Sequence, residues 1–204
     1  MNFYDRHIAP ALINLACATK PIAKQREKIV PRAHGTVIEI GFGSGHNLPY
    51  YDASKVKRVI ALEPSPGMRK RAAKRIAQSP ITLDFIDLPG EQIPLDSQSV
   101  DTVMITYTMC SIDDVAAALA QMRRVLRPSG ELLFCEHGRA PDAGIARWQD
   151  RLTPAWRHIG GGCRLNRDIP ALVRQGGFTI TDLQEMYVPH TPRVLGYNYW
   201  GAAR

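Results

Sequence analysis

Short apolar runs alternate with longer amphipathic stretches along most of the 204-residue chain. The apolar runs are rich in β-branched residues, as in strands that are buried in a parallel sheet, whereas the intervening stretches have helical spacing. This alternation predicts an α/β fold, a mostly parallel seven-stranded sheet with helices on both faces. The expected strands are Val37–Ile40, Arg58–Leu62, Ile81–Phe85, Val100–Ile105, Glu131–Cys135, Thr179–Gln184 and Val194–Tyr199, and the expected helices are Pro66–Ala77, Asp113–Val125, Ala143–Trp156 and Ile169–Gln175.

The pattern changes in the last third of the chain. The helix that begins at Asp113 should end in a turn over Arg127–Gly130, before the next buried strand. Between the last two expected strands no stretch is long enough for a parallel crossover. These strands are therefore predicted to form an antiparallel hairpin that closes the sheet.

The length fits one domain, in which residues 35–204 form the sheet and residues 1–34 form a helical N-terminal lid. The lid contains an apolar segment, Ile8–Ala18, that has some features of a signal peptide. Asp5 beside Arg6 and the interruptions at Pro10 and Asn14 argue against that interpretation. The segment is also too short to cross a bilayer, so we expect a helix packed over a ligand pocket.

The composition, 45% hydrophobic and 22% charged, is ordinary for a soluble globular protein. A net charge of +7 could reflect nucleic acid, an anionic membrane surface or an anionic substrate. The basic residues are scattered, however, and the densest run, Arg69–Arg75, lies on an expected helix and is interpreted as a solvated face. The four cysteines form no CxxC motif and no Cys/His pair at metal spacing, so we predict no metal site, reduced thiols and a cytoplasmic location.

The strongest local motif is a glycine loop directly after the first strand, Gly41-Phe42-Gly43-Ser44-Gly45-His46-Asn47. Glycine is needed where the backbone turns sharply and a ligand lies against it, but many nucleotide sites use such loops. Here His46 occupies the place of the third glycine of the dinucleotide fingerprint, and the Gly-Lys-Ser/Thr of a P-loop is missing. Glu39 would repel a pyrophosphate but suits the cationic amino end of S-adenosylmethionine (SAM).

A second acidic residue, Glu63, ends the next strand, 22 residues after Gly41. A carboxylate at this position can accept hydrogen bonds from the two hydroxyls of a ribose. The alternative, that it caps the following helix, is weakened because Ser65 already fills that role.

Together these motifs resemble the class I SAM-dependent methyltransferases, which have a Rossmann-like fold with an antiparallel C-terminal strand. Asp87–Asp96 matches the family's adenine loop, although Pro89 replaces its usual acid, so that the backbone of Gly90 and Glu91 is left to hold the adenine. The resemblance implies SAM as cofactor. The implied binding residues are Glu39, Gly41, Phe42, Gly43, Gly45, Asn47, Glu63, Pro64, Gly90, Glu91 and Thr106.

Several further segments resemble the thiol S-methyltransferases, namely Asn47–Tyr51, Cys110–Ile112, Glu136-His137 and Gly161–Asp168. The resemblance implies a small-molecule partner and S-methylation of sulfide or a small thiol. Phospholipid N-methyltransferases and quinone C-methyltransferases share the core motifs and stay open as alternatives, as does a non-catalytic SAM-binding regulatory subunit. Thr106–Met109 stands where nucleic acid amino-methyltransferases carry an Asn/Asp-Pro-Pro-aromatic element, so we expect no nucleic acid partner. The oligomeric state stays open.

A thiol reacts as its thiolate, so a base near the acceptor would help. His137 follows a strand at the edge where such folds bind ligands and is the candidate base, the alternative being a buried histidine bonded to a carbonyl or to Glu136. Arg167 either favours an anionic substrate or pairs with Asp168 or Glu136. Four aromatic residues are candidates for the pocket wall, Tyr4 and Trp156 with Trp148 and Tyr197, and Cys110 and Cys163 are candidate nucleophiles. For all six, the alternative is that they only pack in the core.

Overall fold

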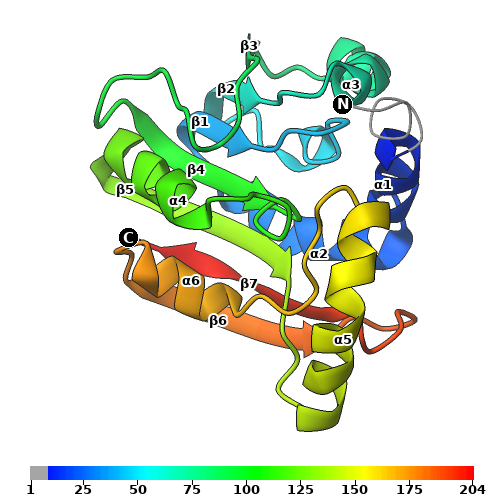
Figure 1. Cartoon of the computed structure of the whole chain (residues 1–204). Coiled ribbons are helices and arrows are strands. Elements are labelled where there is room, and N and C mark those ends of the chain that lie inside the picture. The colour runs from blue at the N-terminus through cyan, green and yellow to red at the C-terminus, as the bar shows by residue number, and fades with distance from the viewer. Residues whose placement is uncertain (1–8) are drawn as a thin grey trace.

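The computed structural model describes residues 9–204, which form one seven-stranded sheet in the order β3-β2-β1-β4-β5-β7-β6 (Figure 1). The first five strands in this order are parallel, β7 runs antiparallel to β5, and β6 runs antiparallel to β7. The predicted Rossmann-like α/β fold and its antiparallel C-terminal hairpin are confirmed. The strands are β1 (Gly35–Ile40), β2 (Val56–Leu62), β3 (Leu83–Ile86), β4 (Val100–Thr106), β5 (Leu126–His137), β6 (Ile180–Tyr187) and β7 (Tyr197–Ala203).

Helices cover both faces of the sheet because the central strands are apolar on both sides. On one face, α4 (Val115–Val125) and α6 (Ile169–Gln175) pack against Ile38, Val103 and Phe134. On the other face, the end of α2 (Lys20–Ile29) and α3 (Pro66–Gln78) pack against Val37, Val59 and Leu133. Ser65 caps α3, as predicted, by accepting a hydrogen bond from the Met68 N–H. Short 3-10 helices, η2 (Val30–Arg32) and η3 (Leu48–Tyr50), join these elements.

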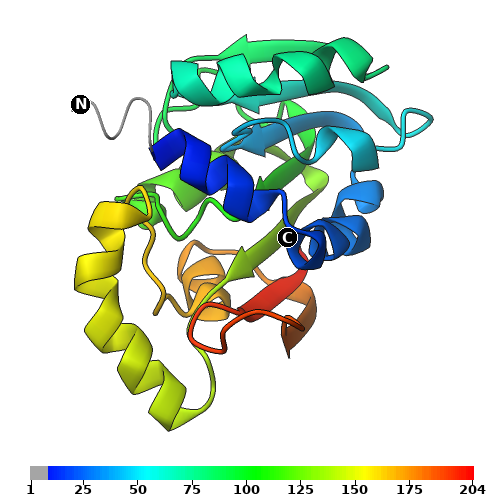
Figure 2. The same ribbon diagram turned by 90° about the vertical axis from the view of Figure 1, so that its right-hand side faces the viewer.

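Two helices lie away from the centre of the sheet. Helix α1 (Ala9–Cys17) lies near α3, and α5 (Ala143–Ile159) stands apart at one side of the molecule (Figure 2). Its position leaves apolar side chains of α5 in solvent, among them Trp148, which is 55% exposed. No helix within residues 9–204 combines the length and the apolar character that crossing a membrane would need.

The structure corrects two predicted boundaries in the second half of the chain. The last strand was expected at Val194–Tyr199 but begins at Tyr197, because Pro192–Gly196 forms a hydrogen-bonded turn, and it continues to Ala203. The small residues Gly201–Ala203 carry little hydrophobic signal, so the sequence did not mark them as a strand. A small residue is needed there because a Cβ at Gly201 would lie 2.0 Å from the Asp182 carbonyl oxygen of β6. The predicted turn at Arg127–Gly130 is wrong, since this segment is extended and belongs to β5.

Candidate active site

The carboxyl ends of β1, β2 and β4 meet at one edge of the sheet and border a cavity of about 500 Å³. The chain order reverses at β1, which lies between β2 and β4, and such switch points are where open α/β sheets bind ligands. The volume is within the range of small-molecule sites. Most of the predicted SAM-binding residues line this cavity: Glu39, Gly41, Phe42, Gly43, Asn47, Glu63, Pro64, Gly90, Glu91 and Thr106.

The glycine loop after β1 has the conformation that only glycine adopts without strain. Gly41, Gly43 and Gly45 have φ values of +71°, +58° and +75°. A Cβ at Gly41 would lie 2.3 Å from the Thr108 side chain, whereas one at Gly43 would meet nothing closer than 3.4 Å. Gly41 therefore serves close packing and Gly43 leaves its backbone open to a ligand. Gly45 is the one predicted SAM-binding residue that is not among the described residues lining the cavity. It packs on Phe42 and Leu48 instead.

Glu63 fastens the glycine loop to the end of β2. One carboxylate oxygen accepts a hydrogen bond from the Gly43 N–H at 2.7 Å, and the other accepts one from the Ser65 N–H at 2.8 Å. The side chain is buried, and burial raises its pKa despite these two bonds. Each oxygen keeps acceptor capacity toward the cavity, as vicinal hydroxyls of a ribose would require.

Glu39 is the second carboxylate in the cavity wall. It accepts hydrogen bonds from the Asn47 amide at 2.9 Å and from the Tyr51 hydroxyl at 2.7 Å. Asn47 also donates to the Thr106 hydroxyl, so three of the predicted residues form one buried network. Only 2% of Glu39 is exposed, and the loss of water raises its pKa to about 7. A cationic ligand group would offset that loss.

The sequence analysis missed a cation in the same cavity, Arg26 of α2. Its guanidinium lies 5.0 Å from the centre of the Tyr107 ring, and it donates to the Cys17 carbonyl oxygen. Arg26 is 4% exposed, and within the described residues its Nε has no hydrogen-bond partner. In the sequence, Arg26 is one of several charges on an amphipathic helix, so nothing local distinguishes it from a surface arginine. Arg26 and Glu39 give the cavity opposite charges, which suit the two ends of an amino acid group.

Helix α1 closes one side of the cavity through Pro10, Ile13 and Cys17. Asn14, which the sequence showed only as an interruption, joins α1 to the glycine loop. Its side-chain oxygen Oδ1 accepts a hydrogen bond from the Ser44 hydroxyl at 2.7 Å and lies 3.1 Å from Nε2 of His46. Burial lowers the pKa of His46 to about 4, so the ring is neutral at pH 7. The predicted wall residue Tyr4 lies outside the described residues.

The other predicted substrate and catalytic residues, His137, Trp156 and Arg167, do not contribute to the cavity wall that the described residues form. Arg167 donates to the backbone carbonyls of Met109 and Ile112, contacts that neither sequence interpretation included. It thereby holds the loop after β4, whose residues Thr108 and Ser111 line the cavity.

Glu136, which the sequence analysis considered only as a partner of His137 or Arg167, supports the same loop. One of its oxygens accepts hydrogen bonds from the Thr108 and Met109 N–H groups, at 2.8 and 3.0 Å. The other oxygen is buried without a partner in the described residues. Burial raises the pKa of Glu136 to about 8.

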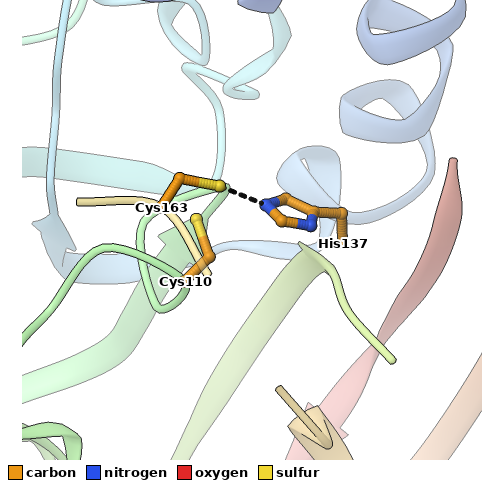
Figure 3. A group of neighbouring side chains, drawn as sticks. All are labelled: Cys110, His137 and Cys163. Atoms are coloured by element: carbon orange, nitrogen blue, oxygen red, sulfur yellow. Dashed lines mark hydrogen bonds between the residues drawn. The ribbon is translucent and has the colours of Figure 1, made fainter. Parts of the chain in front are cut away.

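His137 lies against two cysteines that are distant in sequence (Figure 3). Its Nε2 is 3.2 Å from the Cys163 sulfur, and the two sulfurs and a ring nitrogen lie within 4.8 Å of one another. The Cys163 thiol and the His137 ring hold the pKa of Cys110 below its usual value despite burial. Sequence spacing could not reveal this group, because Cys163 and His137 are 26 residues apart and belong to different elements.

Comparisons with known proteins agree with this geometry. Residues 38–134 match a family model described as a methyltransferase domain. Human thiol S-methyltransferase TMT1B is 32% identical over 169 residues, covering 78% of this chain and 68% of the relative. Human thiol S-methyltransferase TMT1A is 30% identical over 176 residues, covering 82% and 71%.

A solved SAM-dependent methyltransferase from Thermotoga maritima shares the fold. It has a TM-score of 0.69 at 20% identity and covers 98% of this chain and 96% of its own. The chain therefore belongs to the SAM-dependent methyltransferases, in the family that includes the thiol S-methyltransferases.

Proposed function

We propose that this methyltransferase transfers the methyl group of SAM to the sulfur of sulfide or a small thiol. The observation that carries the proposal is the extent of the similarity to the thiol S-methyltransferases. It covers 78–82% of the chain, well beyond the 38–134 region of the general domain. The similarity therefore extends beyond the segment that carries the general domain.

The cavity residues fit SAM on grounds of charge and shape. We assign the ribose hydroxyls to Glu63, the ammonium group to Glu39 and the carboxylate to Arg26, whose Nε has no partner in the described structure. The adenine is assigned to the loop of Pro89, Gly90 and Glu91. A ligand ammonium would offset the loss of hydration that Glu39 undergoes on burial, and a ligand carboxylate would do the same for Arg26.

When bound, SAM supplies a methyl carbon that its sulfonium has already activated. The protein's part is to hold the acceptor in line with the departing sulfur and to exclude water. The loop after β4 is suited to this positioning, since Glu136 and Arg167 fix its backbone from behind. The acceptor thiol would lose its proton to solvent, and its sulfur would form a bond to the methyl carbon as the bond from that carbon to the sulfonium breaks and S-adenosylhomocysteine leaves.

The test is an acceptor panel with radiolabelled SAM. The panel pairs each small thiol with the alcohol of the same skeleton and adds sulfide, phosphatidylethanolamine vesicles and a quinol. We expect labelled methanethiol from sulfide and labelled methyl thioethers from the thiols, and no labelled product from the alcohols. Labelled phosphatidylethanolamine or quinol with every thiol inert would replace this proposal by the N- or C-methyltransferase alternative. Tight SAM binding without any labelled product would support a regulatory subunit instead.

A further inference from the structure

Cys110, His137 and Cys163 come from three different segments of the chain, and their side chains meet (Figure 3). Cys110 lies in the loop after β4, His137 ends β5, and Cys163 follows α5. Thiolate and imidazole are the ligands that zinc prefers in proteins. Two cysteines and one histidine with a vacant fourth position also form one of the known ligand sets of catalytic zinc.

The distances are close to those of a tetrahedral zinc site. With Zn–S bonds of about 2.3 Å and a Zn–N bond of about 2.0 Å, the sulfurs would be about 3.8 Å apart and each about 3.5 Å from the nitrogen. In the structure the three atoms lie within 4.8 Å of one another, and the Cys163 sulfur is 3.2 Å from His137 Nε2. Shifts of about 1 Å or less would suffice, which rotations of the side chains can supply.

The backbone around the three residues is held in place by hydrogen bonds. The Arg164 N–H donates to the Cys110 carbonyl oxygen, so the two cysteine-bearing segments are bonded directly. Arg167 and Glu136 fix the residues on either side of Cys110. Metal sites need such support, because ligands must be held before the ion arrives. Glu136, next to His137 in β5, has a buried carboxylate oxygen without a partner in the described chain.

The three residues adjoin the cavity without lining it. Ser111, next to Cys110, and Gly161, two residues before Cys163, both contribute to its wall. An ion bound here would have its fourth position vacant, since among the described residues only these three form such a group. A metal lowers the pKa of a coordinated thiol so far that the thiolate is bound.

We propose that Cys110, His137 and Cys163 bind one Zn²⁺ ion whose fourth position takes the acceptor thiol. The second part rests on the proposed function, whereas the metal site stands by itself. The thiol's proton leaves to solvent on coordination, the sulfur gains the methyl group as the bond to the sulfonium breaks, and the resulting thioether, a weaker ligand, dissociates. His137 then acts as a metal ligand, not as the base expected from the sequence.

The test measures metal binding directly on the full chain, purified without chelators. Bound zinc is determined by mass spectrometry, and Co²⁺ is added to the metal-free protein to record the near-ultraviolet band of cobalt–thiolate bonds. We expect about one zinc per chain and a thiolate band. In Cys110→Ala and Cys163→Ala, zinc affinity should fall by at least about 100-fold, more than for loss of an outer partner. Cys135→Ala, which removes a buried thiol outside the group, should bind like the wild type.

Thermal melting identifies variants that fail to fold. The cobalt band of the wild-type protein tests metal binding without any variant. Absence of the band, or equal zinc affinity in Cys110→Ala and Cys135→Ala, would overturn the metal site. So would a disulfide between Cys110 and Cys163 in the protein as purified, identified as a linked peptide pair in a non-reducing digest. Adding a small thiol to the cobalt protein should strengthen the band. An unchanged band would overturn the role of the fourth position and leave the metal site standing. Thiol methylation by a zinc-free protein would likewise overturn that role, without touching the metal site or the proposed function.

Discussion

Replacing Glu63 by alanine removes a carboxylate that holds two main-chain N–H groups, those of Gly43 and Ser65. A buried donor left without a partner costs about 1–3 kcal/mol. Because the cavity admits water that can replace part of the loss, we expect the free energy of unfolding to fall by about 2–4 kcal/mol. For a chain of this length that corresponds to a decrease in Tm of about 5–15 °C.

The same substitution should weaken SAM binding. Losing the hydrogen bonds between a charged acceptor and the ribose hydroxyls costs about 1.5–3 kcal/mol, or about 10- to 150-fold in Kd. Glu63→Gln keeps one carbonyl oxygen as acceptor, so its effect on both quantities should be intermediate. Calorimetric titration with SAM and thermal melting measure the two effects on the same samples.

Asp84→Ala is the matched control, because it removes an exposed carboxylate from the neighbouring strand β3. It should leave Kd unchanged and Tm within a few degrees of the wild type, since an exposed ion pair contributes about 0–1 kcal/mol. A folded Glu63→Ala protein that binds SAM within about twofold of the wild type would refute the ribose assignment. An unchanged Tm would refute the argument that Glu63 holds the glycine loop.

Three further predictions concern the cavity walls. The pKa of Glu39 is raised to about 7 in the free protein, and a bound ammonium should lower it. SAM affinity should therefore rise about five- to tenfold between about pH 6 and pH 7.5, and it should stay constant over this range in Glu39→Gln. Parallel pH profiles of the wild type and the variant would contradict this. Gly41→Ala should lower the free energy of unfolding in chemical denaturation by about 2–4 kcal/mol, because Gly41 has a φ of +71° and a Cβ there would collide with Thr108. Gly144→Ala, on an open helix surface, should not lower it, and equal effects of the two substitutions would refute the packing argument. Asn14→Ala should speed SAM dissociation in stopped-flow measurements by about three- to tenfold, because the hydrogen bond from Ser44 is lost. Asn14→Asp keeps the acceptor oxygen, so SAM should dissociate from it at the slow rate of the wild type. If SAM leaves both variants at the wild-type rate, α1 does not retain the ligand.

The sheet was predictable where strands are buried on both faces. The runs that became β1, β2 and β4 each contain β-branched and other apolar residues that are buried over most of the strand, so their type and order followed from the sequence. The β7 segment Gly201–Ala203 was missed because small residues are selected there by the close approach of β6, a contact between distant parts of the chain. Pro128 and Gly130 were interpreted as a turn, although an irregular register in β5 accommodates both.

The candidate site divides in the same way. Glu39, Glu63 and the glycine loop carry local signals, since Glu39 lies near the carboxyl end of a buried strand, and Glu63 and the loop directly follow buried strands at the ligand-binding edge. Arg26 and Asn14 depend on how α1 and α2 pack on the loop, which no short motif records. Their partners lie in other elements, so only the folded chain shows that Arg26 is a buried charge in the cavity and that Asn14 joins α1 to the glycine loop.

Mass spectrometry of the acceptor product tests the central claim most directly. The protein is loaded with SAM that carries a trideuterated methyl group and is mixed, in a single turnover, with a small alkyl thiol and its matching alcohol in equal amounts. We predict that the trideuteromethyl group appears on the thiol sulfur and not on the alcohol. We also predict that Glu63→Ala slows the reaction at low SAM in proportion to its lost affinity. A thiol without label, while the protein binds SAM and methylates an amine, a carbon or an oxygen, would contradict the account.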